Sequence, residues 1–272
     1  MKVTIFGARG SLPICDQNYM EFGGNTTCFL IEDDQENQII VDSGTGIRNL
    51  GKSDVLNQNK ISIVLTHFHW DHIQGFPFFS PAYNKQSKIQ IMALEDDMTM
   101  PEFKARMESQ MKPSFFPVGI YDMGANISLK LYDQERLFLH SGFMTETIQL
   151  NHPGGCRAIK VVDQSGKSII VMTDHEHEEM KINPKYINFC KGADLLIHDA
   201  HYTESERAQN VNWGHSSFDQ AIRLTEEAGV KKLLMTHHNP DYNDLFLSSK
   251  EKEYQFFMPH VTIAREGETY SA

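Results

Sequence analysis

A six-residue run carries four side chains that are strong metal ligands: His67, His69, Asp71 and His72. It directly follows an apolar stretch of strand type at 61–65. In an extended chain His67 and His69 point the same way, so both can bind one ion, while Asp71 and His72 follow as the chain turns and can reach a second ion. Imidazole and carboxylate suit zinc and also iron and manganese. The run therefore predicts a metal centre at a strand end rather than a histidine-rich surface loop.

Four later segments have the same form: a short, mostly apolar run of strand type that ends at a residue able to bind metal. They are 147–151 before His152, 168–173 before Asp174, 193–198 before Asp199 and 230–236 before His237. In α/β folds, functional sites collect at the carboxyl ends of strands, where loops converge on one cleft. Five such strand ends in one chain predict a shared site.

At this point the sequence resembles the metallo-β-lactamase-fold superfamily. Within it, the chain is most similar to the phosphodiesterase branch typified by the tRNA 3′-processing endonuclease tRNase Z. The resemblance covers nearly the whole chain: segments 6–11 and 23–27 look like the two N-terminal glycine turns of that branch, and 41–46 resembles its strand, aspartate and small residues ahead of the histidine motif.

The resemblance implies a binuclear site. One ion would be held by His67, His69 and His152, the other by Asp71, His72 and His237, and both by Asp174. The ions are expected to be two divalent cations, zinc first, with manganese or iron as alternatives. For Asp42 we expect support of a ligand or of a turn rather than a catalytic role.

Two further elements favour phosphodiester hydrolysis over β-lactam or thioester hydrolysis. Segment 196–202 resembles the His-Glu-Ala-Thr element of the branch, with Asp199 in place of glutamate, and segment 213–217 is similar to its Gly-His-Ser-Thr element. In that family the acidic residue of the first element pairs with the histidine of the second. The resemblance therefore implies a pair between Asp199 and His215, and the residues expected to take part in catalysis are Asp71, Asp199 and His215.

The surroundings of His215 support this reading on physical grounds. Segment 217–220 has the form of a capping box, an apolar helical pattern follows, and Gly229 is placed to end the helix. His215 then lies just before a helix N-terminus, where free N–H groups and the helix dipole favour a phosphate oxygen. A nearby carboxylate would keep the imidazole protonated, as a general acid requires. The alternative is a polar residue without a special partner.

These observations predict a metal-dependent hydrolase, a phosphodiesterase acting on a small phosphodiester such as a cyclic nucleotide. A hydroxide bridging the two ions would attack phosphorus, and His215, oriented by Asp199, would protonate the departing oxygen. The alternatives are a tRNA 3′-processing endonuclease and a lactone or glyoxalase-like thioester hydrolase. A catalytically silent binding protein would have lost ligands, and none is missing from the pattern.

The net charge of the chain indicates which kind of phosphodiester is the more favoured substrate. The formal net charge is −11, and the sequence shows neither a basic stripe nor the glycine- and proline-rich arm with which the tRNA-processing relatives hold tRNA. Phosphate contacts by cations supply much of the affinity of proteins for long nucleic acids. A nucleic-acid substrate is therefore possible but less favoured than a small phosphodiester.

Length and composition predict one α/β domain over residues 1–272. Apolar residues make up 40% of the chain, enough for two sheets with helices outside. We expect a four-layer αββα sandwich, built from two αβ halves at about 1–125 and 126–272, with the metals along one edge. No apolar run reaches the ~18 residues of a membrane span, and the first strand-like segment lacks the core of a signal peptide. We expect a cytoplasmic protein, and a homodimer is left open as an alternative to a monomer.

The remaining residues are assigned more conservatively. The four cysteines are dispersed and not expected to form disulfides, and Cys156 is expected to be a small filler. Segments 76–81 and 103–123 carry aromatics that suit a pocket wall, a lid, an interface or the core. The other histidines are expected to lie outside the metal site: His175 and His177 as solvated or supporting residues, His238 facing away from His237, and His140, His201 and His260 without identified partners.

Overall fold

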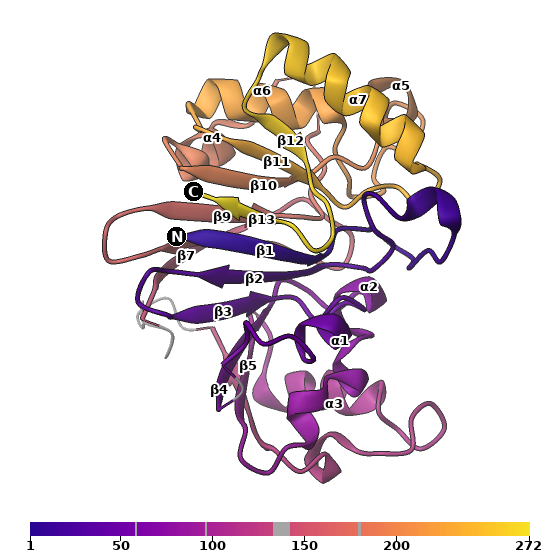
Figure 1. The fold of residues 1–272 in the computed structure, drawn as a ribbon, viewed down its shortest axis with the longest axis vertical. Helices are drawn as coiled ribbons and strands as arrows, with labels where there is room; N and C mark the ends of the chain where they lie inside the picture. Colours follow the sequence, from indigo (N-terminus) through magenta and orange to yellow (C-terminus); the bar gives the residue numbers. More distant parts are fainter. Residues whose placement is uncertain (58, 96, 133–141, 179–180) are drawn as a thin grey trace.

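Two mixed β-sheets form the centre of the protein (Figure 1). The computed structural model describes residues 1–272 apart from 58, 96, 133–141 and 179–180, so His140 lies outside the described residues. The first sheet has the order β13-β1-β2-β3-β4-β5-β6. Its strands are β1 (Lys2–Gly7), β2 (Cys28–Glu32), β3 (Gln38–Val41), β4 (Lys60–Leu65), β5 (Lys88–Ala93), β6 (Asn126–Leu131) and β13 (Thr269–Ser271).

The second sheet has the order β12-β11-β10-β9-β8-β7. Its strands are β7 (Met144–Gln149), β8 (Arg157–Val162), β9 (Ser168–Met172), β10 (Leu195–Asp199), β11 (Leu233–Thr236) and β12 (Val261–Ile263). Neighbouring strands are parallel from β3 to β6 and from β9 to β12. In a parallel run all carboxyl ends meet at one edge, so the loops after β3, β4, β9, β10 and β11 can converge.

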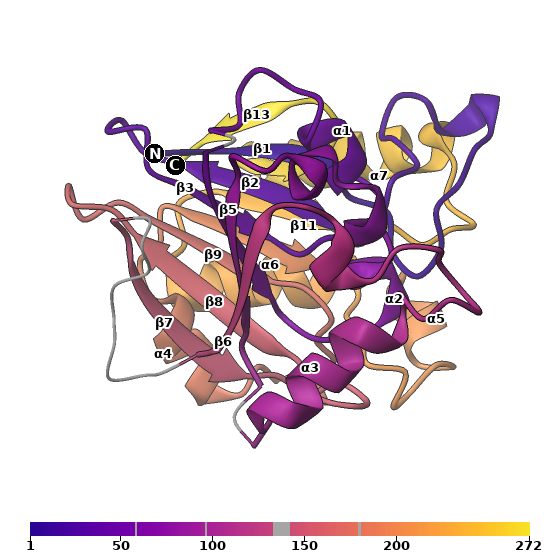
Figure 2. The same cartoon turned by 90° about the horizontal axis from the view of Figure 1, so that it is seen from below.

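Helices cover the outer face of each sheet. On the first sheet these are α1 (Ile47–Leu50), α2 (Trp70–Ile73) and α3 (Met100–Ser109); on the second they are α4 (Pro184–Cys190), α5 (Glu204–Arg207), α6 (Phe218–Ala228) and α7 (Asp244–Phe257). Figure 2 shows α3 at the first-sheet side, where it contacts β6. In the described part of the chain, no helix is long and apolar enough to span a membrane.

Three apolar cores fill the spaces between these layers. One lies between the two sheets and joins, for example, Val3 and Phe29 of the first sheet to Val171 and Ile197 of the second. The other two lie between each sheet and its helices. Strands covered on both faces have no solvent-facing side, which is why β2, β9, β10 and β11 are buried at every position and read as continuous apolar runs. The predicted four-layer αββα sandwich is confirmed.

The sheets do not divide the chain at residue 125. Strand β6, at 126–131, continues the parallel run of the first sheet beside β5. The last strand, β13, returns to the first sheet and pairs antiparallel with β1, covering an edge that would otherwise be open. The division between the sheets therefore falls between β6 and β7, and the C-terminal end of the chain belongs to the first sheet.

Arg9 joins the loop after β1 to the loop after β11. The residue is fully buried, and its guanidinium donates to the carbonyl of Gly23 (2.8 and 3.2 Å), to that of Asn239 (3.1 Å) and to that of Tyr242 (2.9 Å). Burial lowers the pKa of Arg9 to about 10, which leaves the side chain charged at neutral pH. One cation thus satisfies three carbonyl groups that belong to segments far apart in the sequence.

We predict that Arg9→Met lowers the free energy of unfolding by at least ~3 kcal/mol, because a buried polar group left without a partner costs about 1–3 kcal/mol. Urea unfolding followed by circular dichroism measures the change. Arg48→Met, at an exposed arginine, is the matched control. Equal stability of the two variants would contradict the proposed role of Arg9.

Candidate metal centre

The structure brings all seven predicted ligand residues into one cluster. Three groups of side chains in the described residues each have ligand atoms within 4.8 Å of one another: two include Asp174, and the third is His201, His215 and His237. The first group is His67, His69, His152 and Asp174, and the second is Asp71, His72, Asp174 and His237. These are the two sets implied by the resemblance.

Backbone conformation at the strand ends directs these side chains. After β4 the chain bends at Thr66, the backbone is extended at His69, and α2 then begins at Trp70, so Asp71 and His72 lie in the first helical turn. Asp174 and His237 follow β9 and β11 with φ of 56° and 59°. These left-handed conformations are rare for residues other than glycine and are typical of functional sites that the surrounding structure holds in place.

The side chains of the first group converge on one carboxylate oxygen. Asp174 Oδ1 lies 3.8 Å from His67 Nε2 and 3.7 Å from His152 Nε2. His152 Nε2 is also 3.0 Å from His69 Nδ1. Three imidazole nitrogens and a carboxylate oxygen thus lie close together, and these are donor types that zinc prefers.

The second group approaches both oxygens of the same carboxylate. His72 Nε2 lies 3.0 Å from Asp174 Oδ2, and His237 Nε2 lies 3.3 Å from Asp174 Oδ1. Asp71 Oδ2 is 3.1 Å from His237 Nε2 and 3.4 Å from His72 Nε2. Asp174 therefore lies between the groups, where a bridging ligand would have to lie.

Two buried nitrogen atoms test whether the cluster suits metal ions. His67 Nε2 and His72 Nε2 are buried and have no hydrogen-bond partner among the described residues, although both face the cluster. Burial, with the charge of His72 next, lowers the pKa of His67 well below its ordinary value, which favours the neutral imidazole that binds metal. Orphaned nitrogens beside carboxylate oxygens fit a pair of borderline divalent cations such as zinc.

Two candidate ligands, His72 and His152, are each held in orientation by a hydrogen bond from Nδ1, the ring nitrogen that faces away from the cluster. His72 Nδ1 donates to Asp42 Oδ2 (2.8 Å), and Asp42 also accepts from the backbone N–H (2.8 Å) and hydroxyl (2.9 Å) of Thr66. His152 Nδ1 donates to the Gly214 carbonyl (2.9 Å). Such bonds direct the second ring nitrogen toward a metal. Asp42 therefore hydrogen-bonds to His72 and Thr66, which agrees with the expectation that it supports a ligand or a turn.

Asp199 and His215 form a close pair beside the second group. His215 Nδ1 donates to Asp199 Oδ2 (2.7 Å), and the His215 ring stacks on His237 with ring centroids 4.8 Å apart. Burial raises the pKa of Asp199, but the charge of His215 and its hydrogen bond outweigh burial and lower the pKa below its ordinary value. An ionised, buried carboxylate thus holds His215 in place.

The N-terminus of α6 differs from expectation. The capping box of Ser217 and Gln220 is present, and Gly229 ends the helix in a left-handed conformation, as predicted. The N–H groups near the helix start are not free for a phosphate, however. Ser216 N–H donates to Asp199, Ser217 N–H to the Gln220 side chain and Phe218 N–H to the Tyr202 carbonyl. These three groups are therefore not the free phosphate donors that were expected, since the fold uses them internally.

Two other histidine predictions need correction. His201, for which the sequence identified no partner, is buried, donates from Nδ1 to the His237 carbonyl (2.8 Å) and stacks on His215. His175 and His177, expected to be solvated or supporting, are buried and lie within hydrogen-bond distance of each other (3.2 Å). His238 faces away from the cluster, as predicted, and donates to the Ala264 carbonyl.

Glu176 is a residue that the sequence reasoning missed. Its carboxylate accepts from the N–H groups of Asn212 and Gly214, both at 2.9 Å, and so fixes the loop that carries Gly214 and His215. The signal in the sequence was the alternation of His175, Glu176 and His177, which places glutamate on the opposite side of an extended segment from both histidines.

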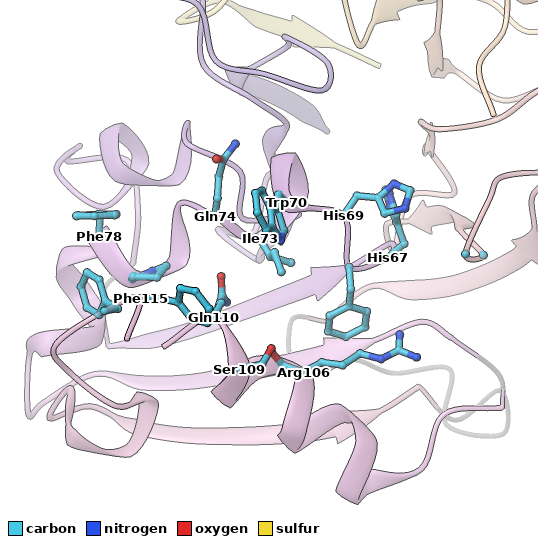
Figure 3. Close-up of a pocket in the computed structure, with 15 residues that line it drawn as sticks. His67, His69, Trp70, Ile73, Gln74, Phe78, Arg106, Ser109, Gln110 and Phe115 are labelled. Atoms are coloured by element: carbon cyan, nitrogen blue, oxygen red, sulfur yellow. The ribbon is translucent and has the colours of Figure 1, made fainter. Parts of the chain in front are cut away.

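A cavity of about 770 Å³ opens beside the first group (Figure 3). His67 and His69 form part of its lining, together with residues of the two segments whose role the sequence left open, 76–81 and 103–123. Phe78 and Phe115 line the cavity, whereas Phe76, Phe79 and Phe103 are buried in the core. Both segments therefore serve as pocket wall and core.

The four cysteines are free, and Cys156 is buried, as expected of a filler.

We predict that Gly214→Ala weakens zinc binding about 10–100-fold, the usual effect of losing support behind a ligand. Gly214 has φ of 88°, and an added Cβ would lie 2.2 Å from His152 Nδ1. Competition with a chromogenic chelator measures the affinity. Gly192→Ala is the control, because Gly192 also has a positive φ but has open space around its Cβ position. Unchanged zinc affinity in Gly214→Ala would refute this role.

We also predict that zinc added to chelator-treated protein raises the midpoint of thermal unfolding by ~5 °C or more, since a ligand that binds only the folded state stabilises it. Asp174→Asn should remove most of this shift, because both ligand groups share the carboxylate. Differential scanning calorimetry measures the midpoint, with Asp54→Asn at an exposed carboxylate as control. A full zinc shift in Asp174→Asn would exclude a bridging role.

Comparison with known proteins agrees with this architecture. Ribonuclease Z of Lactococcus lactis is 24% identical over 296 residues, covering 86% of this chain and 89% of its own. The crystal structure of the metallo-β-lactamase fold protein YhfI from Bacillus subtilis has a TM-score of 0.74 at 19% identity and covers 100% of this chain and 98% of its own. Human tRNase Z, short form, has a TM-score of 0.70 at 20% identity, with 100% and 99% covered. The family model described as a Beta-lactamase superfamily domain matches residues 37–238. The chain belongs to the β-lactamase superfamily, in the metallo-β-lactamase fold that its strand-end ligands predict.

Proposed function

We propose that this protein is a binuclear metal-dependent phosphodiesterase that acts on a small phosphodiester, with zinc as the preferred ion. The observation that carries this proposal is the 2.7 Å pair of Asp199 and His215 beside the second ligand group. When bound, two divalent ions would supply a hydroxide nucleophile at neutral pH and neutralise charge on the phosphate. His67, His69, His152 and Asp174 would hold one ion, and Asp71, His72, His237 and Asp174 the other.

The geometry of His215 suits proton delivery to a leaving oxygen. Its Nδ1 is bound to Asp199, so Nε2 is the nitrogen left to carry a proton to the substrate. The ring lies against the rings of His237 (4.8 Å) and His152 (5.4 Å), one from each ligand group. A general acid in this position can reach an ester oxygen of a phosphate held between the two groups.

Size and charge favour a small substrate. The cavity beside the ligands, about 770 Å³, is of the size that holds a small molecule. The formal net charge of −11 disfavours long-range attraction of a polyanion such as tRNA. The names of the ribonuclease Z and tRNase Z relatives favour the alternative, an RNA endonuclease. Precursor tRNA therefore belongs in the substrate panel beside cyclic mononucleotides and dinucleotides.

We predict that His215→Ala lowers kcat at least ~100-fold on a diester with an alkoxide leaving group, as expected for a lost general acid. The loss should be much smaller on bis(p-nitrophenyl) phosphate, whose leaving group departs without protonation. Steady-state kinetics on zinc-loaded protein, with the zinc content of each sample measured, makes the comparison.

Asp199→Asn is the companion variant, since it keeps the shape of the partner and removes its charge. Its loss of kcat should also be larger on the alkoxide diester than on bis(p-nitrophenyl) phosphate, but smaller on both than in His215→Ala. An equal loss on both substrates in His215→Ala would mean that the histidine positions the metals or the substrate, and would refute the general-acid assignment.

A further inference from the structure

The cavity beside the first ligand group has aromatic walls from two separate segments. Figure 3 shows Trp70, Ile73, Gln74 and Phe78 on one side and Arg106, Ser109, Gln110 and Phe115 on the other. Three of these are exposed to an extent unusual for large aromatics: Trp70 at 80%, Phe115 at 77% and Phe78 at 58%. Phe78 is held by an edge-on contact with Phe116, with ring centroids 5.4 Å apart. Flat rings that face a hollow provide stacking surfaces.

The charge of the cavity wall is already balanced. Arg106 is the only lysine or arginine among the described lining residues, and its Nη1 lies 2.6 Å from a carboxylate oxygen of Glu95. Its guanidinium also lies over the Phe68 ring, 5.1 Å from the centroid. A second phosphate would find no unpaired lysine or arginine in this wall. The cavity therefore suits an uncharged group.

One polar group in the wall lacks a partner. Gln110 lines the cavity, and its Nε2 atom is buried without a hydrogen-bond partner among the described residues. A buried donor left unpaired is unfavourable, and a ligand that brings an acceptor removes that cost. An alkyl chain offers no acceptor, whereas a nucleobase offers several on its edges.

We propose that this cavity binds one ester substituent of the phosphodiester, and that this substituent carries a ring of the nucleobase type: uncharged, planar and with hydrogen-bond acceptors. This inference rests on the proposed function. His67 and His69 line the cavity and also belong to the first ligand group. A phosphate at that group therefore has the cavity directly beside it, within reach of its own ester substituent. Stacking on the aromatic wall and pairing with Gln110 then determine the substrate class: a nucleoside phosphodiester rather than a diester of two small alcohols.

The test compares two diesters that release the same alcohol: the methyl ester of thymidine 5′-phosphate, and the same diester without its base. We expect kcat/KM to be about tenfold or more higher with the base, a factor typical of stacking one base on aromatic side chains. Phe115→Ala and Gln110→Leu should each remove most of this preference, chiefly through KM, and leave the abasic diester within about twofold. Lys112→Ala, at an exposed residue between them that does not line the cavity, is the matched control.

Binding is measured separately from turnover. The chain has two tryptophans, so Trp213→Phe leaves Trp70 as the only tryptophan reporter. Thymidine, which carries no phosphate, should quench the Trp70 fluorescence of this variant, and Phe115→Ala and Gln110→Leu should weaken that binding about tenfold.

The outcomes separate the two proposals. If neither diester is cleaved by zinc-loaded protein while thymidine binds, the proposed function is wrong and the ring site stands. If both diesters are cleaved equally and neither variant changes the ratio, the ring site is wrong and the phosphodiesterase stands. Conversion of a dimer to a monomer by Phe115→Ala in sedimentation would show that the aromatic wall is an interface between copies of the chain, and would overturn the inference.

Discussion

The central constraint on this molecule is the burial of carboxylates at the ends of its strands. Asp42, Asp71 and Asp174 surround His72, and all are buried between the two sheets and their loops. Burial lowers the pKa of His72, but the three carboxylates outweigh burial and raise the pKa well above its ordinary value. Carboxylates in such a place need positive charge close by. In the protein alone, protonated histidine supplies that charge; divalent ions would displace the protons and take over the role.

Local periodicity made most of the ligand cluster predictable. Each candidate ligand outside the histidine run lies at or just after the end of an apolar strand. Parallel strands bring such ends to one edge of the sheet, and this does not depend on the sequence of the loops. The pairing of Asp199 with His215 came from family resemblance, and the structure places the two side chains 2.7 Å apart. The fold class followed from the same strand pattern.

The sequence did not reveal hydrogen-bond partners that come from distant segments of the chain. His201 can be buried because the carbonyl of His237, directly after β11, accepts a hydrogen bond from its Nδ1–H. Glu176 acts on a loop some 36 residues later in the chain. The N–H groups at the start of α6 are taken by groups from the preceding strand and loop. The two aromatic segments were ambiguous for a related reason, since Phe76 and Phe78 differ only in which side of a short turn they face.

The return of β13 to the first sheet makes completion of that sheet depend on residues made after all its other strands. Strand β1 is made long before β13, yet its outer edge pairs with residues 269–271, and the N–H of Ala272 donates to the carbonyl of Met1 (Figure 1). Until those residues leave the ribosome, β1 presents an unpaired edge, which is open to mispairing with other chains. The pairing of β1 with β13 therefore has to wait for the other strands of the sheet to be made. Contacts of such long sequence separation form slowly, so the edge of β1 is the part of this fold most dependent on protection during biosynthesis.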